Sequence, residues 1–154
     1  MLDIRNPSTG KVLKSIRETS SKELQISIQE ARAFLPKWSE VSLDKKLHSI
    51  NKFCKSLEQS LETAAQTLTS EMGKPITQSR GEIKATIPRI EWFMQEAKKS
   101  IDTQTIFSDE NIIEQISYEP KGVIANISAW NYPYFVGTNV IIPALLSGNT
   151  VIYK

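Results

Sequence analysis

The stretch that decides the fold is "EPKGVIANISAWNYPYFVGTNVIIPALLSGNTVIYK", residues 119–154. It opens with a short apolar segment, residues 123–127, and closes with a second one, residues 150–154. The intervening residues have helical length, with Pro133 in a position that suits a first helical turn and Gly148 at the end. Strand, helix and strand in this order predict one βαβ crossover with parallel strands.

A parallel sheet of only two strands leaves both faces and both edges uncovered. No further strand follows residue 154 in this sequence. We therefore expect an α/β fold in which this βαβ unit is the first part of a larger sheet.

Upstream of this stretch the sequence predicts three helices. The first opens with a capping box, since Ser20 and Glu23 stand three residues apart, and Pro36 is expected to end or kink it. Residues 42–72 carry apolar side chains in steps of three and four, which predicts one long amphipathic helix. A third helix is expected over residues 76–100.

Shorter segments flank these helices. Residues 4–16, "IRNPSTGKVLKSI", predict a turn between two extended pieces, because Asn-Pro and Thr-Gly favour turns. Residues 101–111, "IDTQTIFSDEN", predict a polar turn. Residues 112–118 alternate imperfectly and carry polar side chains, which indicates a strand at a sheet edge or at a subunit contact.

Composition excludes several classes of protein. Of the 154 residues, 40% are hydrophobic and 23% are charged, and the net charge of +2 is too small to indicate a nucleic-acid or anionic-membrane partner. No apolar run is long enough for a membrane span, and the first residues lack the apolar core of a signal peptide. With one cysteine and no possible internal disulfide, we expect a cytoplasmic protein.

The same survey leaves few catalytic candidates among the helices. Cys54 lies in the apolar stripe and is expected to be a buried, unreactive thiol. His48 is the only histidine and has no second histidine or cysteine at metal-ligand spacing, so no metal site is expected.

Polar and aromatic side chains gather where the two predicted strands end. In open α/β sheets, ligands bind beyond the carboxyl ends of the strands, which here carry residues 128–131 and Lys154. The Asn131 amide could donate to a developing oxyanion, and Lys154 could donate to nucleotide hydroxyls or phosphates. Alternatively, Trp130 is a core residue, Asn131 caps the helix and Lys154 is solvated. No glycine-rich phosphate loop decides between these interpretations.

The segment "EPKGVIANISAWNYP" followed by "PALLSGNTVIYK" strongly resembles the aldehyde dehydrogenase superfamily, whose pattern is close to E-P-x-G-V-x-x-x-I-x-P-W-N-x-P and then P-A-L-x-x-G-N-x-V-x-x-K-P. The stretches "NPSTGKVL", "ARAFLPKW" and "EMGKPITQSRGEI" agree in the family order, so the resemblance covers the whole chain. The last of these is similar to the branch that includes succinate-semialdehyde dehydrogenases.

The resemblance implies a fold and a set of roles. The fold would be amino-terminal helices plus the first βαβ unit of an incomplete Rossmann-like cofactor domain. Asn131 would hold the oxyanion formed when a cysteine attacks an aldehyde, and Lys154 would bond the adenosine ribose of NAD or NADP. Ile127, Ser128, Ala129 and Trp130, with Asn131, would line the cofactor cleft. Residues 111–120 resemble the family's oligomerisation strand.

Two departures from the family pattern matter. Ala129 replaces the usual proline, which leaves the backbone there less fixed. The family's nucleophilic cysteine, glutamate base and catalytic domain have no counterpart here. We therefore expect residues 1–154 to be a partial cofactor-binding domain of an enzyme that oxidises an aldehyde to a carboxylic acid, inactive alone. The alternative is an interaction module that forms a homo-oligomer or complements a separate carboxyl-terminal chain or a full-length homologue.

Overall fold

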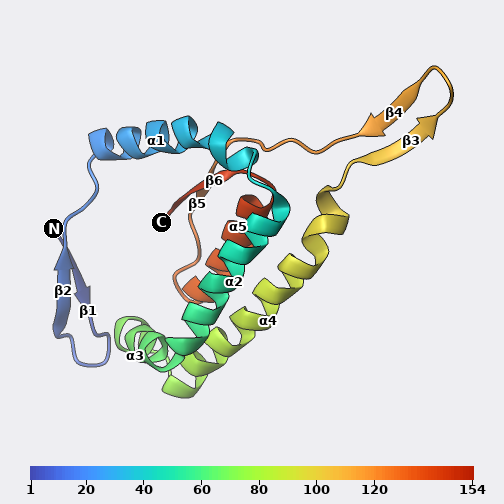
Figure 1. The fold of residues 1–154 in the computed structure, drawn as a ribbon. Coiled ribbons are helices and arrows are strands. Elements are labelled where there is room, and N and C mark those ends of the chain that lie inside the picture. The colour runs from blue at the N-terminus through green and yellow to red at the C-terminus, as the bar shows by residue number, and fades with distance from the viewer.

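A computed structural model describes residues 1–154. The elements, in chain order (Figure 1), are β1 (Leu2–Arg5), β2 (Val12–Ile16), α1 (Ser21–Ser39), α2 (Leu43–Gln59), α3 (Leu61–Met72), α4 (Ile76–Ile101), β3 (Gln104–Ser108), β4 (Ile113–Ile116), β5 (Val123–Asn126), α5 (Pro133–Leu146) and β6 (Thr150–Tyr153).

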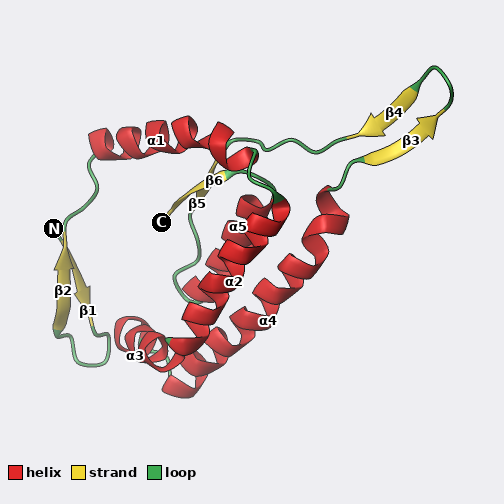
Figure 2. Cartoon of the chain, in the orientation of Figure 1, coloured by secondary structure: helices red, strands yellow, loops and turns green.

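The strands form three separate two-stranded sheets: β1–β2 and β3–β4 are antiparallel, and β5–β6 is parallel. Figure 2 shows helices as the bulk of the molecule, with the β1–β2 and β3–β4 hairpins at its periphery. The predicted α/β fold class and the βαβ unit formed by β5, α5 and β6 are confirmed.

The hydrophobic core lies among α2, α3, α4 and α5, with α4 in contact with each of the other three. Its largest fully buried hydrophobic side chains are Ile83 and Ile90 of α4 and Ile142 of α5.

Helix α1 packs on β6 and β5, and near its carboxyl end the Trp38 indole N–H donates to the Leu145 carbonyl of α5 at 3.1 Å. The Thr150 hydroxyl donates to the Ala31 carbonyl across 3.2 Å. The strands β5 and β6 therefore lie between α1 and α5.

The single helix predicted over residues 42–72 is wrong, because the structure divides it into α2 and α3 at Ser60. Ser60 has φ −92° and ψ 7°, and α3 leaves in a different direction from α2 (Figure 1). The apolar spacing runs through the break, so Leu57 and Ala65 are both buried. Periodicity indicates which residues face the core and carries no information on the direction of the axis.

The other helix boundaries follow the expected chemistry. Gly73, with φ +75°, ends α3, and α4 begins directly after Pro75. Pro36 lies inside α1, which continues for three further residues to Ser39, so that proline marks the last turn and not the last residue. No helix is both long enough and apolar enough to cross a membrane.

The polar turn predicted over residues 101–111 is also wrong in part, because Gln104–Ser108 form β3. The turn itself is confined to the residues after β3, where the Asp109 carboxylate accepts the backbone N–H groups of Asn111 and Ile112, both at 2.8 Å. Polar residues on both sides concealed a short run of good strand formers, Thr105 to Phe107.

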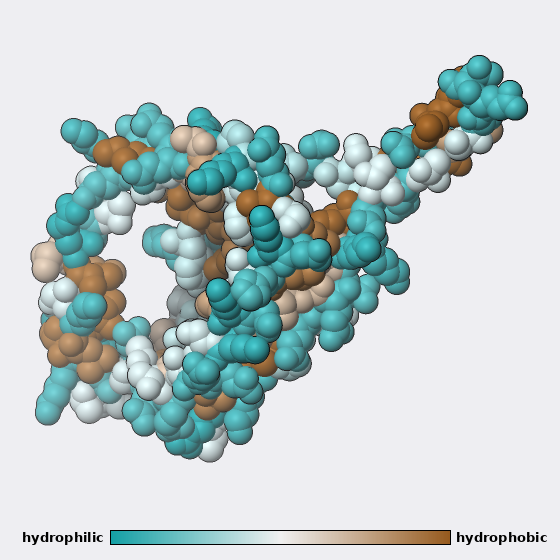
Figure 3. Space-filling model, viewed as in Figure 1, coloured by the Kyte–Doolittle hydropathy of each residue, from teal (hydrophilic) through white to brown (hydrophobic).

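The β3–β4 hairpin projects away from the helices (Figure 1) and shows exposed hydrophobic side chains. Figure 3 shows hydrophobic surface on this hairpin and a larger collection over the β1–β2 hairpin. The exposed hydrophobic residues of the projecting hairpin are Ile106, Phe107, Ile112, Ile113 and Ile116.

The capping box at the start of α1 is confirmed and makes a pH prediction. Glu23 accepts from Arg17 and from the Ser20 backbone N–H, and these contacts lower the pKa of its carboxyl from 4.5 to about 2. Because the folded-state pKa is the lower one, the cap stabilises α1 above pH 4.5 and loses this effect as pH falls toward 2. An NMR titration should place the Glu23 midpoint near 2, and Arg17→Gln should raise it. An ordinary midpoint in the unmutated chain would contradict the contacts of Glu23 with Arg17 and Ser20.

Candidate functional site

The carboxyl ends of β5 and β6 are joined by backbone hydrogen bonds that extend the parallel ladder. The last pair in register is Asn126 with Tyr153. Beyond it, the Lys154 N–H donates to the Asn126 carbonyl at 2.9 Å, and the Ser128 N–H donates to the Lys154 carbonyl at 3.2 Å. The structure thus brings Ser128 and Lys154 side by side at the carboxyl ends of the two parallel strands, where ligands bind in open α/β sheets.

A buried amide lies directly beneath this junction. The Asn126 side chain donates to the Gly137 carbonyl at 3.1 Å and accepts from the Ser128 hydroxyl at 2.8 Å. It therefore links the end of β5, the loop that follows and helix α5. Sequence reasoning missed Asn126; the available signal was a polar residue in an otherwise apolar strand.

Helix α5 approaches β6 closely because of a glycine. A Cβ atom on Gly137 would lie 2.8 Å from the Tyr153 hydroxyl, well inside normal contact. That hydroxyl donates to the Pro133 carbonyl at 3.2 Å. Tyr153, the last residue of β6, is therefore linked to Pro133, the first residue of α5, at the point where the loop between β5 and α5 ends.

The loop between β5 and α5 is open to solvent. Trp130 is 74% exposed and Ile127 is similarly open, so the interpretation of Trp130 as a core residue is wrong. Asn131 is exposed and does not cap α5, whose N-cap is Tyr132 without a side-chain cap. Two large apolar side chains displayed beside an amide form a surface suited to a ligand or another polypeptide segment.

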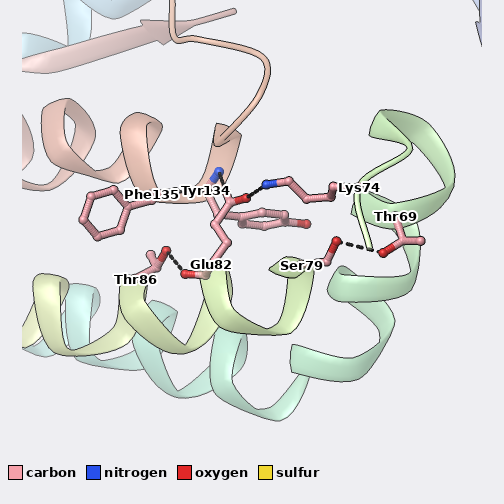
Figure 4. A network of polar contacts seen from close by, with 7 residues as sticks. All are labelled: Thr69, Lys74, Ser79, Glu82, Thr86, Tyr134 and Phe135. Carbon is pink, nitrogen blue, oxygen red and sulfur yellow. Dashed lines mark hydrogen bonds and ion pairs between the residues drawn. The ribbon is translucent and has the colours of Figure 1, made fainter. Parts of the chain in front are cut away.

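The start of α5 is capped instead from α4, by Glu82 (Figure 4). One carboxylate oxygen of Glu82 accepts the backbone N–H groups of Tyr134 at 2.9 Å and Phe135 at 3.3 Å. The other oxygen is 2.6 Å from the Lys74 ammonium. A carboxylate at a helix N-terminus satisfies first-turn donors and interacts favourably with the helix dipole.

Sequence reasoning missed this network, although one signal was present. Glu82 directly precedes Ile83 on the buried face of α4, between Ser79 and Thr86. Figure 4 shows Ser79, Glu82 and Thr86 along α4. The Ser79 hydroxyl lies 2.8 Å from the Thr69 hydroxyl, and the Thr86 hydroxyl donates to the Glu82 backbone carbonyl. An acid on a buried helix face indicates a partner somewhere in the fold, without saying which.

Burial shifts the pKa values of two side chains, Tyr134 and Cys54. Burial, with smaller contributions from Glu71 and Glu82 and from Tyr153, raises the pKa of the Tyr134 hydroxyl. Burial likewise raises the pKa of the Cys54 thiol, as do Glu91 and Glu58 to a lesser extent.

Cys54 is a free cysteine that is buried among core residues, as expected. No group of three His, Cys, Asp or Glu side chains in residues 1–154 is arranged to hold a metal ion.

This arrangement has counterparts among known proteins. The sequence pattern of the aldehyde dehydrogenase family matches residues 1–154. The chain belongs to the aldehyde dehydrogenase family. The family resemblance drawn from the motifs is therefore confirmed over the full length.

Individual aldehyde dehydrogenases show what the chain is similar to. A glutarate-semialdehyde dehydrogenase of Pseudomonas putida is 30% identical over 156 residues, covering 99% of this chain and 32% of the relative. A succinate semialdehyde dehydrogenase of Escherichia coli, whose name records NAD(P)+, is 28% identical over 97% of this chain and 32% of its own length. The glyceraldehyde-3-phosphate dehydrogenase of Methanocaldococcus jannaschii, solved with NADP, superposes with a TM-score of 0.92 at 25% identity, covering 99% of this chain and 33% of its own. Residues 1–154 thus span about a third of these proteins.

Proposed function

We propose that residues 1–154 are the amino-terminal part of the cofactor-binding domain of an NAD(P)-dependent aldehyde dehydrogenase, which oxidises an aldehyde to a carboxylic acid. The observation that carries this proposal is the junction of β5 and β6, where Ser128 and Lys154 lie side by side and the exposed residues Trp130 and Asn131 follow in the chain. Family membership supplies the reaction class.

The residues of the junction fit one side of a dinucleotide. Lys154 offers an exposed ammonium group at the end of β6, where it would donate to the adenosine ribose. Residues 127–130 offer an apolar, solvent-open wall for the cofactor cleft. The bound nicotinamide would supply the hydride acceptor. No phosphate-binding loop is present in residues 1–154, so contacts to the pyrophosphate would come from elsewhere in the protein.

Asn131 is the proposed catalytic residue. Its side-chain amide is exposed and makes no hydrogen bond within the chain, so its N–H groups are available to an oxyanion formed when a nucleophile adds to the aldehyde carbonyl. Cys54 cannot be that nucleophile, since it is buried in α2. The nucleophile and the hydrolytic base would come from the two thirds of the relatives' length that residues 1–154 do not span.

We infer that the substrate is a semialdehyde, an aldehyde that also carries a carboxylate. Support comes from the sequence style of residues 71–83, "EMGKPITQSRGEI", and from relatives named for glutarate and succinate semialdehydes.

We also propose that the β3–β4 hairpin, with residues 111–120, pairs with another copy of the protein. A projecting two-stranded hairpin has little stability of its own, and its exposed hydrophobic side chains and free strand edges are suited to association. The open edges of β5–β6 favour complementation by further strands in the same way. A monodisperse monomer by light scattering, at all concentrations and with a carboxyl-terminal piece of a relative present, would contradict both associations.

The function is tested with a hybrid enzyme, in which residues 1–154 replace the matching segment of the Pseudomonas putida glutarate-semialdehyde dehydrogenase. We expect aldehyde-dependent formation of NADH or NADPH with glutarate or succinate semialdehyde. Residues 1–154 alone serve as the control and should show no turnover. A folded hybrid that neither binds a nicotinamide cofactor nor turns over would contradict the proposal.

Replacing Lys154 with alanine should weaken cofactor binding. Loss of one charge-assisted hydrogen bond at an open site is expected to raise the KM for NAD(P)+ about tenfold, with little change in kcat. Steady-state kinetics of the hybrid measure both constants, with Lys11→Ala in the β1–β2 turn as the matched control. A loss of kcat at unchanged cofactor KM would contradict the ribose contact.

A further inference from the structure

We propose that Glu82, held in place by Lys74, is a positioning residue that sets the loop from Trp130 to Tyr132 and thereby orients Asn131. The inference rests on the proposed function of Asn131 as the oxyanion donor. Neither Glu82 nor Lys74 lies in the exposed loop, so both would act through the residues that they contact.

The first step is that α5 depends on Glu82 for its start. The N-cap residue Tyr132 contributes no side-chain hydrogen bond, and Pro133 has no N–H to donate. The next two N–H groups, of Tyr134 and Phe135, both point at one oxygen of Glu82. The first turn of the helix is therefore fixed by an acid on another helix, through residues three and four positions after Asn131.

The second step is that the same ion pair reaches the residue next to Asn131. The Lys74 ammonium lies 3.8 Å from the centroid of the Tyr132 ring, close enough for a cation–π contact. Only 11% of the Lys74 side chain and none of the Glu82 side chain is exposed, so water weakens the pair little. The Lys74 ammonium group makes both contacts at once, which fixes its position between the Glu82 carboxylate and the Tyr132 ring.

The third step is that the backbone around Lys74 is itself constrained. Lys74 stands between Gly73, which has φ +75°, and Pro75. A Cβ atom on Gly73 would lie 2.5 Å from the Pro7 side chain, so the chain passes close to the β1–β2 turn here. The short link from α3 to α4 therefore fixes where the Lys74 side chain starts and limits where its ammonium group can lie.

The fourth step concerns the other end of the loop. Ser128 is held by Asn126 and by the Lys154 carbonyl. The loop is therefore anchored at Ser128 on one side and at Tyr132–Tyr134 on the other, and the Asn131 side chain makes no hydrogen bond that would fix its direction. Its orientation must come from these two anchors.

A purely structural ion pair makes different predictions from a positioning one. If Lys74 and Glu82 only stabilise the fold, replacing them lowers the unfolding temperature and leaves the folded loop unchanged. If they position Asn131, replacing them changes the folded loop and lowers kcat, while the KM for aldehyde stays within about twofold of the parent value.

The variants separate the two cases. Glu82→Gln keeps an acceptor for the helix N–H groups and removes the partner of Lys74, and Lys74→Met keeps the stem and removes the charge. Glu62→Gln, in the exposed Glu62–Arg80 pair, is the matched control. Lys74→Arg is the rescue variant, since a guanidinium can pair with a carboxylate and stack on an aromatic ring.

The first readout is an NMR spectrum of residues 1–154, recorded under conditions in which every variant is folded. The Asn131 side-chain amide and Trp130 indole signals should shift or broaden in Glu82→Gln and Lys74→Met, and stay unchanged in Glu62→Gln. Lys74→Arg should restore them. Unchanged signals in both test variants would overturn the inference, and this result does not depend on enzyme activity.

The second readout is the kcat of the hybrid enzyme. We expect Glu82→Gln and Lys74→Met to lower it about tenfold to a hundredfold, the range for a misplaced catalytic group. If both keep the parent kcat while Asn131→Ala loses it, the positioning inference fails and the proposed function stands. If Asn131→Ala keeps the parent kcat, the proposed function of Asn131 fails.

Discussion

Asn131→Ala is expected to lower the kcat of the hybrid enzyme about 10²–10³-fold, which is the usual cost of removing one oxyanion donor. The donor acts on charge that develops in the transition state, so the loss should appear in kcat and much less in the KM for the aldehyde. Because the side chain is exposed and makes no internal hydrogen bond, the unfolding temperature should not change.

Steady-state kinetics with a saturating cofactor measure this loss. Asn51→Ala, an exposed asparagine on α2, is the matched control and should keep the parent kcat. A kcat for Asn131→Ala equal to that of the parent hybrid would remove Asn131 from the reaction. A large fall in unfolding temperature would show that the residue serves the fold instead.

Glu82→Ala is expected to lower the free energy of unfolding by about 3–5 kcal/mol. The substitution leaves the Lys74 ammonium without its partner in a site where the lysine side chain is 11% exposed. It also leaves the N–H groups of Tyr134 and Phe135 without an acceptor.

Urea unfolding of the 154-residue chain, followed by circular dichroism, measures the difference. The control is Glu62→Ala, because Glu62 forms an ion pair with Arg80 at the surface, with side chains 51% and 40% exposed. Surface pairs of this kind contribute at most about 1 kcal/mol. Similar losses in the two variants would show that burial of Glu82 has no special consequence.

The βαβ unit is predictable because its signals are local. Two short apolar segments frame a helix that begins at Pro133 and is followed by Gly148, and the right length of connection makes the strands parallel. The break at Ser60 is not predictable in this way, since the apolar spacing of α2 and α3 is the same on both sides of it. The strand β3 was hidden because polar residues flank its three strand-forming ones.

The same contrast between local and long-range signals applies to the residues of the candidate site. The positions of Ser128 and Lys154 can be predicted, because each follows one of two strands that are expected to be parallel and whose carboxyl ends meet at one edge of the sheet. The role of Glu82 does not, because its helix partners lie 52 and 53 residues further along the chain and its charge partner lies on a third segment. The packing of α5 on α4 brings the Tyr134 and Phe135 N–H groups to Glu82, and no local pattern in the sequence specifies that packing.

The most direct test of the account is a crystal structure of the hybrid enzyme with bound NAD+ or NADP+. We predict that the Lys154 ammonium lies within hydrogen-bonding distance of the adenosine ribose, and that residues 127–130 line the cofactor cleft. The Asn131 amide N–H groups should lie beside the nicotinamide and face the position that the carbonyl oxygen of an aldehyde would occupy. A cofactor bound away from the ends of β5 and β6 would contradict the account.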